Sequence, residues 1–212
     1  MKGVRGLYAI TPQEESTERL LDLVRLAIEG GASVIQYRNK QATAAQQLSQ
    51  AQALRSLTRA YNVPLIINDG IALALSVDAD GAHLGRDDGD TAAARAQLCD
   101  KLLGVSCYDD LAQAEAAQSR GADYVAFGAA FSSPTKPTAV HAAFSLFRQA
   151  HRLLHVPIVA IGGITLENAP ALVETGIDAV AVISALFGAA DVRATARRFS
   201  LLFEGSRHAD PQ

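Results

Sequence analysis

Eight short apolar runs, spaced regularly along the chain, constrain the fold more than any other feature of the sequence. Each run is three to five residues long, and together they cover residues 6–10, 33–37, 65–67, 81–84, 102–105, 124–127, 158–161 and 179–183. A strand with water on one face alternates apolar and polar residues, whereas these runs are apolar nearly throughout. They are therefore predicted to be strands buried on both faces, as in a parallel sheet.

Between the runs lie stretches rich in Ala, Leu, Gln and Arg, with the spacing of amphipathic helices. The clearest apolar stripe consists of Leu20, Leu21, Val24, Ala27 and Ile28. Ser16 or Thr17 is predicted to cap this helix, and Asp109 or Asp110 a later one. Helices that alternate with buried strands indicate an α/β protein.

A glycine-containing turn recurs between helix and strand at residues 29–32, 119–123 and 174–178, where glycine supplies the left-handed residue that ends a helix. Eight strands in 212 residues give one unit per ~26 residues, which is compact for a (β/α)8 TIM barrel of ~250. A doubly wound open sheet is the alternative, but its Gly-x-Gly-x-x-Gly fingerprint does not follow the first strand. We predict a single TIM-barrel domain over residues 1–212, with a frayed polar tail at 205–212.

Composition excludes several classes of protein. The chain is 49% hydrophobic and 19% charged, enough to bury a sizeable core, and its formal net charge of −3 argues against a nucleic-acid partner. Two cysteines are too few for a disulfide framework, which favours a cytoplasmic location. Neither a signal peptide at the first residues nor an apolar run of ~18 residues is recognisable, so no membrane partner is expected.

In a TIM barrel the active site lies at the carboxyl ends of the strands, so the residues that follow each run are informative. Gln36, Arg38 and Lys40 alternate after the second run and could meet an anion together. A solvated basic loop is the simpler interpretation of these three residues.

Acidic residues follow the third and fourth runs. Asp69 and one of Asp87 and Asp88 could supply two carboxylates to Mg²⁺, with phosphate oxygens and water completing the octahedron. The alternatives are a helix cap for 71–75 at Asp69 and a plain acidic turn at 87–90. His83 alone is more typical of a packed, hydrogen-bonded histidine than of a catalyst.

Three later strand ends carry features that suit phosphate. The loop 132–138 combines hydroxyl groups with Lys136, whereas paired glycines at 162–163 and Ile183-Ser184 follow the last two runs. In many barrels the last two strand ends hold phosphate through backbone N–H groups. The sequence thus predicts two anion-binding zones and one metal zone, without an obvious general base.

Taken in order, the motifs resemble those of the thiamine-phosphate synthase family. They are Gln-Tyr-Arg-Asn-Lys at 36–40, Ile-Asn-Asp at 67–69, the segment 78–85, Gly-Val-Ser at 104–106, Ser-Pro-Thr-Lys at 133–136 and Ile-Gly-Gly-Ile at 161–164. The likeness spans about residues 6–188. It implies a transferase, thiamine-phosphate diphosphorylase, which joins 4-amino-2-methyl-5-(diphosphooxymethyl)pyrimidine to a thiazole phosphate or its carboxylate in thiamine biosynthesis and releases diphosphate by a dissociative substitution.

The resemblance also implies roles for individual residues. The residues that match the family's positions for the pyrimidine diphosphate are Gln36, Arg38, Lys40, Asn68 and Lys136. His83 and Ser106 match residues beside the pyrimidine. Asp69 and Asp88 match ligands of the Mg²⁺ cofactor. Ser133 and Thr135 match positions that flank the thiazole phosphate and the diphosphate, and the thiazole phosphate pocket is matched by Gly163, Ile183 and Ser184. Asn39 and Pro134 lie within the matched motifs as further substrate-binding positions. Ser106, Lys136 and Arg38 are the expected catalytic residues.

The chain departs from the family pattern at Gly70, where a larger polar residue is common, at Arg86 in place of glutamine, and at Ser133 in place of threonine. Two other functions stay open: a thiazole tautomerase-like barrel, and a regulatory barrel that binds thiamine intermediates without turnover. The presence of Arg38, Lys40, Asp69, Asp88 and Lys136 favours the synthase. A homodimer is one option for the oligomeric state.

Overall fold

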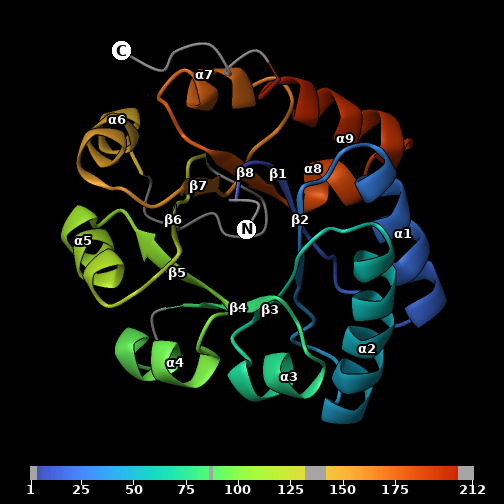
Figure 1. Ribbon diagram of the computed structural model, residues 1–212. Coiled ribbons are helices and arrows are strands. Elements are labelled where there is room, and N and C mark those ends of the chain that lie inside the picture. Colours follow the sequence, from blue (N-terminus) through green and yellow to red (C-terminus); the bar gives the residue numbers. More distant parts are fainter. Residues whose placement is uncertain (1–3, 86–87, 132–141, 205–212) are drawn as a thin grey trace.

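In a computed structural model of the protein, the structure describes residues 4–85, 88–131 and 142–204. Eight parallel strands form a closed barrel in sequence order, with β1 paired to β8 through Gly6 and Ala179 (Figure 1). The strands are β1 (Gly6–Ile10), β2 (Val34–Tyr37), β3 (Leu65–Asn68), β4 (Gly81–Leu84), β5 (Leu102–Tyr108), β6 (Tyr124–Phe127), β7 (Ile158–Ile161) and β8 (Ala179–Val182). The predicted TIM barrel is confirmed.

Helices surround the barrel on the outside (Figure 1). They are α1 (Thr17–Glu29), α2 (Ala44–Ala60), α3 (Ile71–Ser76), α4 (Thr91–Leu98), α5 (Leu111–Ser119), α6 (Phe144–Leu153), α7 (Ala169–Val173), α8 (Ser184–Phe187) and α9 (Val192–Leu201). Within the described parts of the chain, none of them combines the length and the apolar character that a membrane span requires. The tail predicted at 205–212 lies outside the described residues.

The local predictions hold with few exceptions. Ser16 caps α1 by accepting a hydrogen bond from the N–H of Arg19, and Asp110 caps α5. The strand predicted at 102–105 is too short, because β5 continues through Ser106 to Tyr108. The helix-cap interpretation of Asp69 is wrong, since Gly70 occupies the cap position of α3 without a side-chain hydrogen bond.

Two apolar layers hold the fold together. The larger layer packs the outer faces of the strands against the helices, and includes Leu20, Leu54 and Phe199, each at most 1% exposed. The smaller layer fills the inside of the barrel. Tyr8 and Tyr124 are its largest members, and both are almost completely buried. Their hydroxyl groups need hydrogen-bond partners there, because burying an unpaired polar group is costly.

Aspartates at the amino ends of three strands join neighbouring strands in pairs. One carboxylate oxygen of Asp80, before β4, accepts the N–H of Leu65 at 2.8 Å. Asp123, before β6, accepts the N–H of Leu103 at 2.7 Å, and Asp178, before β8, that of Ile158 at 2.8 Å. The aspartates before β4, β6 and β8 thus hold the starts of β3, β5 and β7 in place. The predicted left-handed glycines precede two of them, at Gly121 and Gly176, both with φ of 91°.

Candidate functional site

Most of the described candidate side chains meet at the carboxyl ends of the strands. Gln36 lies on β2, Asn68 ends β3, His83 lies on β4 and Ser106 lies on β5. Register pairs Asn68 with His83 on the adjacent strand. Because the barrel closes in sequence order, these four positions occupy consecutive strands around one side of its mouth (Figure 1).

Lys40, Asp69 and Asp88 form a charged cluster above β2, β3 and β4. The ammonium group of Lys40 lies 3.0 Å from a carboxylate oxygen of Asp69. Burial raises the pKa of Asp88, and a hydrogen bond shared with the carboxyl group of Asp69 raises it further. The two carboxyl groups predicted from sequence as a pair are therefore brought together, beside a lysine.

The backbone aims both carboxyl groups into this cluster. Asp69 adopts a left-handed conformation with φ of 64°, and its N–H donates to the carbonyl of His83 at 2.8 Å. Asp88 accepts the N–H of Gly85 at 2.7 Å, and a Cβ at Gly85 would lie only 2.9 Å from Asp88 Oδ2. The glycine after β4 thus permits the close approach of the Asp88 carboxylate.

Two carboxylates suit a cation that keeps part of its coordination for water and phosphate. Mg²⁺ is usually bound in this way, through one or two carboxylates together with substrate phosphate oxygens. Among the described residues no group of three or more His, Cys, Asp or Glu side chains could hold a metal. Asp69 and Asp88 together present two carboxyl groups, which is the number of protein ligands that a Mg²⁺ site of this kind uses.

On the opposite side of the mouth, a glycine loop follows β7. Gly162 and Gly163 both have positive φ, at 101° and 62°, and a Cβ at Gly162 would lie 2.7 Å from Ala129 Cα. Asn168 braces this loop, because its amide donates to the carbonyl of Gly163 at 3.0 Å and accepts the N–H of Thr165 at 2.8 Å. The role of Asn168 was missed in the sequence, where it resembles an ordinary polar residue before a helix.

The remaining candidates occupy different surroundings. Ile183 is the cap residue of α8, which begins at Ser184. The backbone N–H of Arg38 donates to Thr11 Oγ1 at 2.9 Å. Asn39 is 7% exposed, and its amide donates to the Glu14 carbonyl and to Gln50 Oε1, so its side chain belongs to the scaffold of the β2 loop. Outside the described residues lie Arg86, Asp87, Ser133, Pro134, Thr135 and Lys136.

His83 connects the mouth with the inside of the barrel. Its Nε2 lies 2.8 Å from Ser106 Oγ, and its Nδ1 lies 3.1 Å from the hydroxyl of Tyr124. Burial lowers the pKa of His83 to about 4, although the charge of Asp88 opposes this shift. The imidazole is therefore neutral near pH 7, and the packed, hydrogen-bonded histidine considered from sequence is what the structure contains.

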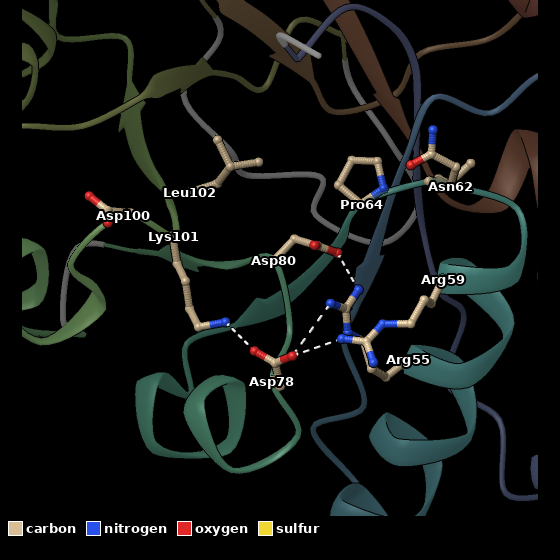
Figure 2. A pocket seen from close by; sticks show the side chains of 10 residues that line it. Arg55, Arg59, Asn62, Pro64, Asp78, Asp80, Asp100, Lys101 and Leu102 are labelled. Carbon is tan, nitrogen blue, oxygen red and sulfur yellow. Dashed lines mark hydrogen bonds and ion pairs between the residues drawn. The ribbon is translucent and has the colours of Figure 1, made fainter. Parts of the chain in front are cut away.

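A cavity of ≈590 Å³ lies at the opposite end of the barrel, where Pro64, Asp80 and Leu102 mark the amino ends of β3, β4 and β5. Figure 2 shows the side chains of Arg55, Arg59, Asp78, Asp80 and Lys101 turned toward one another, whereas Asp100 points away from them. Asp78 accepts from Lys101 at 2.7 Å and from Arg59 at 2.8 Å. These contacts lower the pKa of Asp78, with the Lys101 hydrogen bond as the main cause. The ion pairs serve the structure of the barrel's amino end.

Comparisons with known proteins agree with one another. The family described as thiamine monophosphate synthase matches residues 7–186. The chain is 56% identical over 201 residues to the thiamine-phosphate synthase of Methylobacillus flagellatus, covering 94% of this chain and 96% of that protein. It is 53% identical to the enzyme of that name from an Azoarcus species, covering 94% and 98%.

Among solved structures, the barrel is similar to a thiamine phosphate pyrophosphorylase from Pyrococcus furiosus. The TM-score is 0.87 at 36% sequence identity, over 95% of this chain and 96% of that one. The likeness therefore extends over nearly the full length of both chains.

Proposed function

The chain belongs to the thiamine monophosphate synthase family, and from this premise we propose how its barrel makes thiamine phosphate. The proposed reaction joins an aminopyrimidine that carries a methylene diphosphate to a thiazole phosphate, and releases diphosphate. The observation that supports it most is the cluster of Lys40, Asp69 and Asp88 at three adjacent strand ends. A barrel that only bound thiamine intermediates would have little use for a paired carboxylate site next to a lysine.

Mg²⁺ is the proposed cofactor, and Asp69 and Asp88 would hold it. When bound, such an ion supplies positive charge to the departing diphosphate. Lys40, already within 3.0 Å of Asp69, contributes a second positive charge at the same place. Its side chain is more than half exposed, so it can turn from Asp69 to a phosphate oxygen of the substrate.

The bond changes balance without a proton acceptor. The bond from the methylene carbon to the diphosphate oxygen breaks, and the diphosphate takes the electron pair. The electron-rich aminopyrimidine shares the positive charge left on the carbon, and the lone pair of the thiazole nitrogen then forms the new C–N bond. The protein acts mainly by positioning both substrates and stabilising the leaving charge, so no general base is required.

The two substrates are proposed to lie on opposite sides of the mouth. The residues proposed to bind the pyrimidine diphosphate are Gln36, Arg38, Lys40, Asn68, His83 and Ser106. Asn39, predicted as a further substrate-binding position, instead holds the β2 loop in place through its side chain. The residues proposed to bind the thiazole phosphate are Gly163, Ile183 and Ser184. The positions given to Ser133, Pro134, Thr135 and Lys136 remain predictions, as do the catalytic roles of Arg38, Lys136 and Ser106.

The experiment that tests this proposal is a diphosphate-release assay with both substrates and Mg²⁺, repeated on Asp88→Asn. We expect the variant to lose at least about a hundredfold in activity, because one carboxylate ligand of two is replaced by a neutral amide. Asp90→Asn is the matched control, since Asp90 caps α4 and asparagine caps helices equally well. Full activity of Asp88→Asn in EDTA would contradict the metal assignment, and binding of both substrates without diphosphate release would contradict the synthase.

The proposed location of this activity is the cytoplasm. Cys99 is exposed and Cys107 is buried, and both are free thiols. Free thiols persist in a reducing compartment. A homodimer remains a prediction.

A further inference from the structure

Inside the barrel, five polar side chains form one continuous hydrogen-bonded chain that ends at the mouth. Gln36 Nε2 lies 2.9 Å from the hydroxyl of Tyr8, which lies 2.8 Å from the hydroxyl of Tyr124. Tyr124 contacts His83 Nδ1 at 3.1 Å, and His83 Nε2 contacts Ser106 Oγ at 2.8 Å. The first four residues are at most 6% exposed, whereas Ser106 is partly accessible. The chain thus links a buried amide to a site residue through the apolar interior.

Each inner member of this chain carries one proton that can be donated. Burial raises the pKa of both tyrosines, so their hydroxyl groups stay protonated. The two ring nitrogens of His83 face the Tyr124 hydroxyl and Ser106 Oγ, and a neutral imidazole carries hydrogen on only one of them. A row of single donors can run in two directions: from Gln36 toward Ser106, or from Ser106 toward Gln36.

The amide at the buried end selects the direction. Gln36 Nε2 is a donor and cannot accept, so the oxygen of Tyr8 accepts from it. The buried Tyr8 hydroxyl also needs an acceptor for its own proton, and Tyr124 is its other partner among the described residues, so this proton goes to Tyr124. Tyr124 in turn donates to His83 Nδ1, which leaves hydrogen on Nε2, and this N–H donates to Ser106 Oγ. The hydroxyl proton of Ser106 then points away from His83.

We propose that Tyr8 and Tyr124 are positioning residues that hold His83 in the Nε2–H tautomer and thereby present the Ser106 hydroxyl to the substrate as a hydrogen-bond donor. Its acceptor is an atom of the bound pyrimidine diphosphate, so this part rests on the proposed function. The assignment of the His83 tautomer does not rest on the proposed function. Hydrogen bonds in such a row polarise one another, so the effect of a distant member reaches Ser106.

Gly104, two residues before Ser106 on β5, makes room for this chain. A Cβ at Gly104 would lie 2.0 Å from Tyr124 Cζ and 2.5 Å from His83 Nδ1. Even alanine is therefore too large where the Tyr124 ring passes the backbone to reach His83. The ring centroids of Tyr124 and His83 are 5.5 Å apart, and those of Tyr124 and Tyr8 are 5.9 Å apart.

The direct test is the tautomer of His83 in the intact wild-type protein, read from two-bond ¹⁵N–¹H correlations of ¹⁵N-histidine-labelled enzyme near neutral pH. The protein contains five histidines, and the His83 signal is identified as the one missing from the spectrum of His83→Gln. We expect hydrogen on Nε2 in the wild type, and a mixture of tautomers in Tyr124→Phe and in Tyr8→Phe. Hydrogen on Nδ1 in the wild type would overturn the proposal whether or not the protein is a synthase.

Tyr37→Phe is the matched control. Tyr37 is also a buried strand tyrosine, but its hydroxyl donates to Gln50 Oε1 at 2.8 Å in the helix layer. Tyr37→Phe also removes one buried hydroxyl group, and it should leave the His83 signal unchanged. A changed His83 signal in this variant would show a general effect of removing buried hydroxyls and would contradict a specific role of Tyr8 and Tyr124.

Kinetics supply the second readout. Tyr124→Phe should lower kcat about tenfold, with little change in the KM of the thiazole phosphate. On a Ser106→Ala background the same substitution should have almost no further effect on kcat, because the hydroxyl group that His83 orients is then absent. Equal losses of kcat on both backgrounds would show that Tyr124 acts independently of Ser106 and would refute the proposal. If the wild type had no synthase activity, the tautomer experiment would still decide the arrangement.

Discussion

Replacing Gly104 by alanine tests how closely the inside of the barrel is packed around the site. The residue lies on β5 inside the barrel, beside the point where Tyr124 reaches His83. A Cβ built there meets the Tyr124 ring at 2.0 Å and its hydroxyl oxygen at 2.3 Å. Carbon atoms in contact prefer separations of ~3.5–4.0 Å. The ring or the strand would have to move by ~1.5–2 Å.

Neither can move at low cost. Tyr124 is completely buried, and Gly104 pairs in register with His83 on β4 and with Tyr124 on β6. Overpacking of this kind costs ~1–3 kcal/mol, and separating Tyr124 from His83 removes a hydrogen bond that contributes ~1 kcal/mol. We therefore expect Gly104→Ala to lower the free energy of unfolding by ~3 kcal/mol, which corresponds to a loss of ~6–12 °C in Tm.

Urea denaturation followed by circular dichroism measures this change, and thermal melts provide a second estimate. Gly70→Ala is the matched control, because a Cβ there meets its nearest atom, Leu73 Cβ, at 3.4 Å, and φ at Gly70 is −95°. Its free energy of unfolding should stay within ~0.5 kcal/mol of wild type. If Gly104→Ala unfolded at the same urea concentration as Gly70→Ala, the packing argument would be refuted.

The barrel could be predicted from sequence because its cause is local. Eight apolar runs, each followed by a helical stretch, leave few architectures, and polar residues after buried runs mark the carboxyl ends. The pairing of Asp69 with Asp88 follows from the same logic, since their strands are neighbours in sequence order. The sequence also allowed Asp69 to be the cap of the following helix. This alternative is wrong because the left-handed backbone at Asp69 turns its carboxylate toward Lys40.

The hydrogen-bonded chain inside the barrel could not be predicted in this way. Tyr8 and Tyr124 are separated by 116 positions and counted in the sequence only as members of apolar runs. Their contact depends on barrel closure, which places β1 and β6 across a shared interior. The role of the aspartates before β4, β6 and β8 was missed for a similar reason. The recurring turns indicated where β6 and β8 begin, but not that the carboxylates before β4, β6 and β8 each accept the N–H of a neighbouring strand.

Three further predictions concern the glycine loop and the aspartates before β6 and β8. Asn168→Ala should raise the KM of the thiazole phosphate several-fold without changing that of the pyrimidine diphosphate in steady-state assays, because the Gly163 carbonyl loses its brace; an unchanged thiazole KM would contradict the placement. Asp123→Asn should lower the free energy of unfolding by ~1–2 kcal/mol, because the Asp123 carboxylate also pairs with Arg95 at 2.8 Å. Asp178→Asn should cost less near pH 7, because burial raises the pKa of Asp178 and its charged form already reduces the stability of the fold. That reduction disappears as pH falls through the raised pKa, so urea titrations at decreasing pH should show wild type gaining stability relative to Asp178→Asn, and the opposite trend would contradict the assignment.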